Sequence, residues 1–278
     1  MSRAFSIAKK AASAFLAFYI VVCLFMWSQQ RFLLYHPHYH TGAPGTYGLQ
    51  GFSDIVLQDE DGTHIIAWVH KANAGYPTIL FFHGNGGDMS YSAGFYAAIA
   101  NAGFGVLAID YRGYGASEGK PTEQGLYQDA RTVITYASHT LDLPSEQIIL
   151  YGESLGTGVA VQMAMEFPVS AIVLQSPYAS IGAVGQEMYP WLPVNYLLED
   201  KFDSLSKIGR VHAKLLLIHG EKDTLVPVSN GRKIFAAANE PKEAVYYPER
   251  GHNDMDVEQR LGPLVAFARK YNLINVAR

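Results

Sequence analysis

Short, continuous apolar runs recur along the chain and are separated by longer segments of mixed polarity. The runs are Thr78–Phe82, Gly105–Ile109, Gln147–Tyr151, Ala171–Leu174, Lys214–His219 and Ala244–Tyr247. Runs of this kind form strands of sheets that are covered on both faces. The segments between them predict helices at about residues 90–102, 122–139, 155–166, 228–238 and 258–273.

Two β-rich runs precede this pattern and predict a hairpin. They are Ser53–Gln58 and His64–Val69, joined through Asp61-Gly62, a pair favoured in hairpin turns. A hairpin followed by β–α repeats predicts a mostly parallel, doubly wound sheet with helices on both sides. Residues 180–206 interrupt the repeat with a Pro-rich stretch and predict a short cap. We therefore expect residues 51–278 to form one α/β domain.

The N-terminus has a different pattern, because residues 11–30 carry no charge. About twenty such residues in a helix cross a membrane. Arg3, Lys9 and Lys10 precede the run, and only Arg31 follows it closely. The positive-inside bias then predicts a signal anchor at residues 11–30, with residues 1–10 in the cytoplasm. Residues 31–50 are expected to be a juxtamembrane linker, and the domain to lie on the periplasmic or lumenal side.

A cleaved signal peptide is the main alternative to this anchor, and a buried core helix is a lesser one. The apolar region of a signal peptide is usually about 7–15 residues long and ends in a small-x-small cleavage site. This run is longer and ends in Phe25-Met26-Trp27-Ser28. The sequence therefore favours an uncleaved anchor, without indicating which membrane holds it.

Composition and charge exclude several function classes. The 278 residues are 49% hydrophobic and 17% charged, which is too apolar for a disordered chain. Beyond residue 34, 17 Lys and Arg face 25 Asp and Glu, a net charge of −8. This sign opposes binding to the phosphates of a nucleic acid, so we expect no such partner. Cys23 is the only cysteine, which excludes a disulfide framework and a cysteine-based zinc site.

The strongest chemical signal is Gly152-Glu153-Ser154-Leu155-Gly156, which stands between a predicted strand and a predicted helix. A sharp strand-to-helix turn of this type exposes its serine above the sheet edge, and glycines on either side leave room for it. Ser154 is thus the predicted nucleophile. The backbone N–H of Leu155, at the helix start, is a predicted oxyanion donor. The alternative is a serine that falls between two glycines by chance.

A serine nucleophile needs a base, and the base needs a carboxylate that orients it. In the relevant chain order the acid follows the serine and the histidine comes last. Asp223 stands just beyond one predicted strand and His252 just beyond the next, so both are expected at the edge where Ser154 lies. Other carboxylates compete with Asp223 for this role: Asp110, Glu221 and Asp254.

Further candidates lie in the loops around this edge. The stretch His83-Gly84-Asn85-Gly86 follows the first parallel strand, and the N–H of Asn85 is the predicted second oxyanion donor, with His83 bracing the loop. In the cap, an apolar lid is one interpretation and ordinary packing the other. The predicted substrate-binding residues there are Met188, Tyr189, Trp191 and Leu192.

Three alternating histidines, His36, His38 and His40, would share one side of an extended chain. A metal site is one interpretation of them, and a plain linker is the favoured one.

The chain resembles membrane-anchored serine hydrolases of the α/β-hydrolase fold, close to the bud-emergence-type hydrolases and the α/β-hydrolase-domain depalmitoylases. The resemblance runs from about Tyr35 to the C-terminus and implies hydrolysis of esters or thioesters. It is carried by His83-Gly84-Asn85-Gly86, by Asp110-Tyr111-Arg112-Gly113-Tyr114-Gly115-Ala116-Ser117, by Gly152–Gly156, by Gly220–Pro227 and by Gly251-His252-Asn253-Asp254.

These features together predict a serine hydrolase that acts on small-molecule or lipid-like acyl esters or thioesters through an acyl-enzyme. Such chemistry requires no metal and no organic cofactor. A serine peptidase of the same fold is one alternative, and a non-catalytic binding or scaffold protein at a membrane is another. The oligomeric state stays open.

Overall fold

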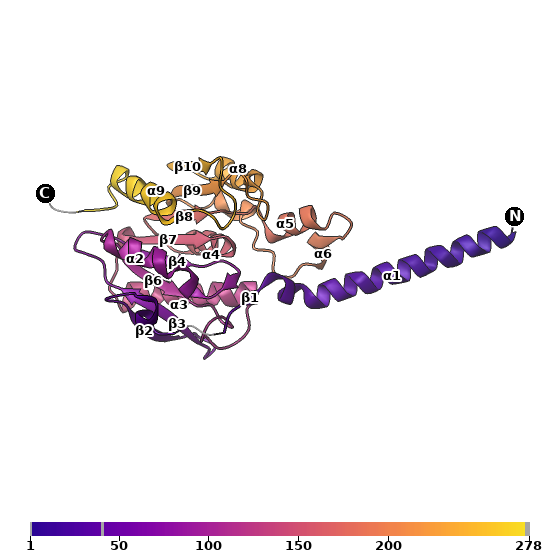
Figure 1. Ribbon diagram of the computed structural model, residues 1–278, viewed down its shortest axis with the longest axis horizontal. Coiled ribbons are helices and arrows are strands. Elements are labelled where there is room, and N and C mark those ends of the chain that lie inside the picture. Colours follow the sequence, from indigo (N-terminus) through magenta and orange to yellow (C-terminus); the bar gives the residue numbers. More distant parts are fainter. Residues whose placement is uncertain (1, 40–41, 276–278) are drawn as a thin grey trace.

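The apolar runs form an eight-stranded sheet in the computed structural model, which describes residues 2–39 and 42–275. The strand order is β10-β9-β8-β7-β4-β6-β3-β2 (Figure 1). Only β2–β3 and β3–β6 pair antiparallel among the neighbours in this sheet. The predicted mostly parallel sheet with an N-terminal hairpin is thus confirmed. The strands are β2 (Ser53–Gln58), β3 (His64–His70), β4 (Thr78–Phe82), β6 (Gly105–Ile109), β7 (Ile148–Glu153), β8 (Ala171–Gln175), β9 (Lys214–Gly220) and β10 (Lys242–Tyr247).

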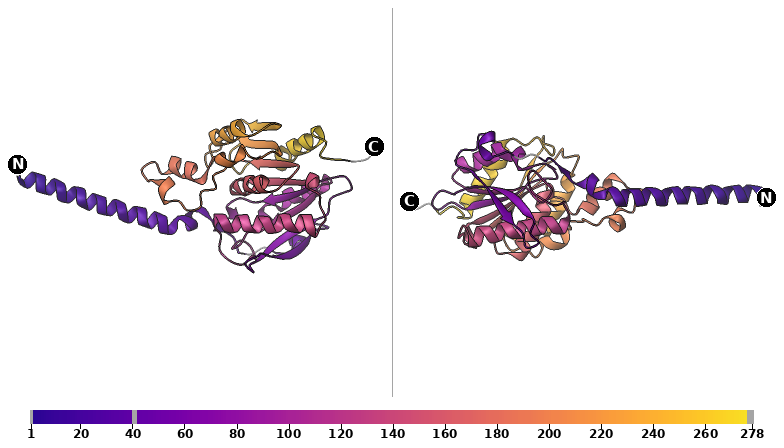
Figure 2. Two further views of the ribbon diagram at one scale, coloured as in Figure 1. Left: turned by 180° about the vertical axis from the view of Figure 1, so that it is seen from behind. Right: turned by 90° about the horizontal axis from the view of Figure 1, so that it is seen from below.

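Helices cover both faces of the sheet, and each face has its own apolar core (Figures 1 and 2). The main helices are α2 (Ala93–Asn101), α3 (Glu123–His139), α4 (Leu155–Glu166), α8 (Val228–Ala237) and α9 (Val257–Lys270). Strand β4 contributes side chains to both cores. Leu80 and Phe82 pack in the core beside α3 and α4. Ile79 and Phe81 pack in the core beside α2 and α9. Because side chains alternate along a strand, this arrangement requires a run that is apolar at every position.

Helix α1 (Ser2–Leu34) extends away from the sheet (Figures 1 and 2). Within the described residues, its segment Phe5–Leu34 is the one helical stretch long and apolar enough to cross a membrane, a criterion that a signal sequence also meets. The helix continues beyond residue 30 and ends at Leu34, and the next residue, Tyr35, is buried in the domain core. Residues at the end of α1 therefore belong to the domain as well as to the apolar helix.

Short elements follow α1 and connect the main ones. β1 (His36–Pro37) pairs in parallel with β5 (Gly86–Gly87), so the chain just after α1 lies beside the loop that follows β4. Three turns of 3-10 helix complete the connections: η1 (Pro44–Tyr47), η2 (Met89–Ser92) and η3 (Ser145–Gln147).

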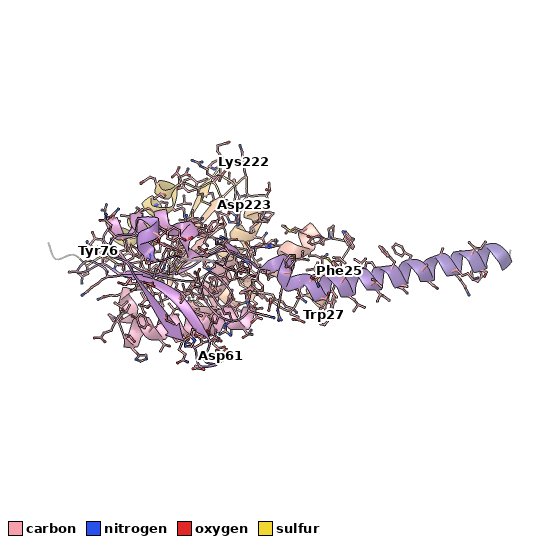
Figure 3. All side chains as sticks on the ribbon, turned by 60° about the horizontal axis from the view of Figure 1, so that its bottom comes forward. Phe25, Trp27, Asp61, Tyr76, Lys222 and Asp223 are labelled. Carbon is pink, nitrogen blue, oxygen red and sulfur yellow. The ribbon has the colours of Figure 1, made fainter. Side chains whose placement is uncertain are left out.

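The segment expected to form a cap is built of short helices between the sheet and α1 (Figure 1). They are α5 (Ile181–Met188), α6 (Val194–Leu197) and α7 (Leu205–Ile208). α5 packs against α6, and α6 also contacts α1, whereas α7 packs on α4 and α8. Figure 3 labels Phe25 and Trp27 where α1 passes this segment.

Polar contacts hold the end of α1 against the end of the cap. The Gln30 side-chain oxygen accepts a hydrogen bond from the Glu199 N–H at 2.7 Å. Arg31 forms ion pairs with Glu199 and with the buried Asp200, each at 3.0 Å. Asp200 also accepts a hydrogen bond from the Glu123 N–H at the start of α3. The C-terminal end of α1 is therefore attached to the body of the domain through Glu199 and Asp200 of the cap.

Candidate active site

Ser154 lies at the turn where β7 passes into α4, and its backbone is strained. Its φ of +50° and ψ of −116° fall in a region that residues other than glycine rarely adopt. A Cβ on Gly156 would clash with the carbonyl of Phe82 in β4, and one on Gly152 would clash with the carbonyl of Gly156. Both glycines are required by close backbone approach, and together they hold Ser154 out of the sheet edge.

The three residues expected to cooperate at this edge form a hydrogen-bonded chain. Nε2 of His252 lies 2.8 Å from Oγ of Ser154, and Nδ1 of His252 lies 2.7 Å from Oδ2 of Asp223. The residues come from the ends of three strands, β7, β9 and β10, that are adjacent or nearly so in the sheet. The carboxyl ends of parallel strands meet at one edge, which is why residues so far apart in sequence come together here.

Asp223 is held as a carboxylate. Its Oδ1 accepts hydrogen bonds from the N–H groups of Leu225 and Val226, at 3.0 and 2.7 Å. Burial alone raises the pKa of this group, but hydrogen bonds from His219 and His252 and the nearby imidazole bring its pKa well below the ordinary value. A carboxylate fixed in this way orients His252 and stabilises it when it is protonated.

The structure places the three competing carboxylates in other interactions. Glu221 pairs with Arg232 at 2.6 Å. Asp254 accepts a hydrogen bond from the Gly251 N–H at 2.7 Å, and Asp110 accepts one from the Met89 N–H at 2.6 Å. Asp223 is the carboxylate that meets His252.

His219 is a residue of this site that the sequence analysis missed. It ends the buried strand β9, and its Nε2 lies 2.9 Å from the carbonyl of Val226 and 3.3 Å from Oδ2 of Asp223. The side chain is fully buried and therefore supports the Asp223 loop from inside the domain. The signal was a single titratable residue at the end of an apolar run, which alone does not distinguish it from a core histidine.

The loop after β4 faces Ser154, and His83 orients one of its peptides. Nδ1 of His83 lies 2.7 Å from the carbonyl of Gly84, so this nitrogen carries the proton and donates to it. In a trans peptide the C=O and the next N–H point in opposite directions. The N–H of Asn85 is therefore directed away from His83. Asn85 and Leu155, the two predicted oxyanion donors, border the same cavity as Ser154.

The chain that follows α1 fixes this loop from the other side. The side-chain amide of Asn85 donates to the carbonyl of Leu34 at 2.9 Å, and its backbone carbonyl accepts from the His36 N–H at 2.9 Å. The hydroxyl of Tyr114 donates to the same carbonyl at 2.9 Å. Asn85 is thus held in place by the end of the apolar helix as well as by the core of the domain.

Two cavities of different character meet at Ser154. An apolar cavity of about 280 Å³ lies between α1, α5 and α6. A polar cavity of about 520 Å³ lies on the other side and is lined by side chains from η2, β7 and α9, among them Asp88, Ser92, Glu153 and Arg260. Ser154 and Asn85 border both. A molecule whose reacting carbon sits at Ser154 would therefore place an apolar part on one side and a polar part on the other.

The structure places three of the four predicted cap residues at the apolar cavity. Met188, Tyr189 and Leu192 line the apolar cavity. Trp191, in the turn after α5, lies outside it, with 57% of its surface exposed. The sequence analysis did not place α1 at this cavity, yet the end of α1 forms one wall of it. The α1 residues in that wall are Met26, Trp27, Gln30, Leu33 and Leu34.

The alternating histidines near the N-terminus have separate environments. His36 lines the apolar cavity, and Nδ1 of His38 lies 2.9 Å from Oδ2 of the buried Asp88. His40 lies outside the described residues. Over residues 2–39 and 42–275 the structure contains no group of three or more His, Cys, Asp or Glu side chains arranged to hold a metal ion.

Comparisons with known proteins agree on the fold. The family model described as alpha/beta hydrolase fold matches residues 77–204. Rv2307c of Mycobacterium tuberculosis is 40% identical over 238 residues, which cover 85% of this chain and 85% of the relative. Human alpha/beta hydrolase domain-containing protein 17B is 33% identical over 186 residues, or 66% of this chain and 63% of its own length. Among solved structures, the Pyrococcus furiosus esterase Pf2001 aligns with a TM-score of 0.67 at 19% identity, covering 86% of this chain and 97% of that one.

The buried His83 makes the stability of the chain depend on pH. Burial lowers its pKa from 6.5 to about 4, so between these values the unfolded chain binds a proton that the folded chain does not. The free energy of unfolding should therefore decrease as the pH falls through this range, by up to about 3 kcal/mol from this group. Urea unfolding of the detergent-solubilised full chain at pH 7 and pH 4.5 measures it. In His83→Asn, which does not titrate, the decrease should be smaller; an equal decrease in both proteins would contradict this assignment.

Proposed function

The chain belongs to the same family of alpha/beta-hydrolase-fold proteins as Rv2307c, and from this premise we propose that it is a serine hydrolase of acyl esters or thioesters. The observation that carries the proposal is the hydrogen-bonded chain from Asp223 through His252 to Ser154, at 2.7 and 2.8 Å. A hydroxyl beside an imidazole that is itself oriented by a carboxylate is the arrangement that activates serine as a nucleophile.

The first half of the reaction forms an acyl-enzyme. His252 takes the proton of the Ser154 hydroxyl through Nε2 while Oγ attacks the carbonyl carbon of the substrate. Asp223 stabilises the imidazolium that results. The N–H groups of Leu155 and Asn85 donate to the oxyanion of the tetrahedral intermediate, and each well-aimed donor contributes about 3 kcal/mol. His252 then gives its proton to the leaving alcohol or thiol, and the bond to that group breaks.

In the second half, water resolves the acyl-enzyme. His252 removes a proton from water, the resulting hydroxide attacks the acyl carbon, and the same donors stabilise the second oxyanion. Collapse returns the proton to Ser154 and releases the carboxylic acid. Apart from the substrate and water, both halves use only side chains and backbone groups of this chain.

The two cavities support an assignment of the two ends of the substrate. The apolar cavity between α1 and the cap suits an acyl chain, and the polar cavity suits the leaving group. The esterase Pf2001 shares the fold, and its name agrees with this class of reaction.

We also propose that α1 holds the enzyme at a membrane, with its N-terminus cytoplasmic and the catalytic domain on the opposite side. The basic residues Lys9 and Lys10 before the uncharged stretch support this orientation.

Replacing the nucleophile should abolish both covalent labelling and turnover. Ser154→Ala is expected to lose labelling by a fluorophosphonate probe and to lower kcat for p-nitrophenyl acetate by at least roughly a thousandfold. Ser53→Ala, at an exposed position of β2, is the matched control and should behave as the unmodified chain. Labelling that persists in Ser154→Ala would contradict the assignment of the nucleophile.

The role of His83 in orienting the Asn85 peptide can be separated from its role in packing. His83→Asn retains a donor near the position of Nδ1, while His83→Leu removes it. Because an oxyanion donor contributes roughly 100- to 1,000-fold in kcat, the leucine variant should lose at least about tenfold in kcat for p-nitrophenyl acetate, with KM little changed. The asparagine variant should retain most of the activity. Equal losses in the two variants would show that the ring matters only for packing.

A further inference from the structure

The cap presents an unusually apolar surface to the outside of the domain. Residues 181–198 contain a single charged side chain, Glu187. Large apolar or aromatic side chains of this segment are nevertheless exposed, above all Trp191 at 57% and Tyr196 at 92%. Exposed apolar side chains gathered on one element mark a surface that contacts something other than water.

Two contacts set this surface at a defined height along α1. The hydroxyl of Tyr19 donates to the carbonyl of Trp191 at 2.9 Å, and Arg31 pairs with Glu199 at 3.0 Å. Twelve residues of helix separate Tyr19 from Arg31, a rise of about 18 Å. This is close to the thickness of one leaflet, about half of a hydrocarbon core of roughly 30 Å.

The uncharged stretch of α1 and the uncharged residues 188–198 of the cap end at the same level. On α1 the stretch ends at Arg31, and on the cap it ends at Glu199, and these two residues form the ion pair. If α1 crosses a membrane, residues 188–198 lie beside the part of α1 that is within one leaflet. The apolar composition of both elements and their shared boundary therefore have one explanation, the hydrocarbon of that leaflet.

The apolar cavity reaches the surface at this height. Trp27 of α1 and Met188 of the cap both line it, and both are also about half exposed, at 48% and 46%. From there the cavity runs down between α1 and the cap to Ser154. An acyl chain that entered beside Trp27 and Met188 would pass between apolar walls all the way to the nucleophile.

We propose that residues 188–198 of the cap are immersed in the leaflet next to the catalytic domain, and that the acyl chain of a single-chain membrane lipid enters the apolar cavity directly from that leaflet. The proposal rests on the proposed function and on α1 as a membrane anchor. It names the substrate as a lipid that reaches Ser154 without crossing water.

The polar cavity indicates the head group of this lipid. Arg260 is paired with Glu153 at 3.1 Å, and Oδ2 of Asp88 lies 2.9 Å from Nδ1 of His38. Burial lowers the pKa of His83, which keeps that side chain neutral at pH 7. The cavity thus offers two carboxylates against one guanidinium and no excess of positive charge, which disfavours an anionic head group. It suits an uncharged leaving group with hydroxyls, such as glycerol. A monoacylglycerol has this head group and a single acyl chain.

Immersion of the cap is tested by measuring the depth of spin labels in phosphatidylcholine vesicles. On a Cys23→Ser background, Trp191→Cys and Tyr196→Cys carry nitroxides on the cap, and Ala74→Cys carries one near Tyr76, which Figure 3 shows at the opposite end from α1. The cap labels should collide more with oxygen than with a water-soluble nickel complex, and the label at position 74 should do the reverse. Preferential collision of the cap labels with nickel would overturn the proposal.

Entry of the substrate from the leaflet is tested with two esters, mono-oleoylglycerol in phosphatidylcholine vesicles and p-nitrophenyl acetate in water. Tyr196→Glu places a charge on the immersed surface and outside the cavity lining. It should hydrolyse the vesicle ester at least about fivefold more slowly and the acetate at the unmodified rate. Val56→Glu, at an exposed apolar position on β2, is the matched control and should change neither rate.

The outcomes separate this proposal from the proposed function. A chain that cleaves the acetate but not mono-oleoylglycerol is a serine hydrolase with another substrate, which overturns the lipid proposal alone. Equal rates for Tyr196→Glu and the unmodified chain on the vesicle ester would overturn entry through the immersed cap. A chain that cleaves neither ester contradicts the proposed function and the lipid substrate together, while the spin labels still decide whether the cap is immersed.

Discussion

The strained backbone of Ser154 is the constraint on which the rest of the site depends. A φ of +50° at a residue with a side chain persists only when its surroundings hold it. Here the first turn of α4 approaches the end of β4 so closely that no Cβ fits at Gly156. The same closeness brings the loop after β4, with Asn85, to the side of the nucleophile. Sheet pairing thus positions the proposed nucleophile and the predicted oxyanion donors together.

Helix α1, the proposed membrane anchor, also contributes to the geometry of the site. Its last turn lines the apolar cavity, and the carbonyl of Leu34 accepts a hydrogen bond from the side chain of Asn85. Arg31 ties the same turn to the cap. The proposed anchor is therefore not a flexible tether: the residues that end α1 also line the apolar cavity and hold the loop that faces Ser154.

Much of the fold could be predicted because buried parallel strands have a local signature. The six apolar runs coincide with β4 and β6 to β10 to within two residues at each end, and the hairpin of β2 and β3 was placed equally well. The cap was less predictable. Met188, Tyr189 and Leu192 line the cavity but Trp191 does not, because side chains in an irregular, Pro-rich turn have no periodicity that tells inside from outside.

The sequence by itself determined the strands, the strained turn at Ser154 and the residue types at the strand ends, because each of these depends on neighbours only a few positions away. The tertiary structure alone decided which carboxylate meets His252, that His219 supports Asp223, and that α1 forms a wall of the apolar cavity. Those contacts join segments far apart in the chain; Gln30 and Glu199, for example, are 169 positions apart. Sheet order and the path of the connecting loops bring such segments together. No local pattern of hydrophobic and polar residues indicates which distant segments will meet.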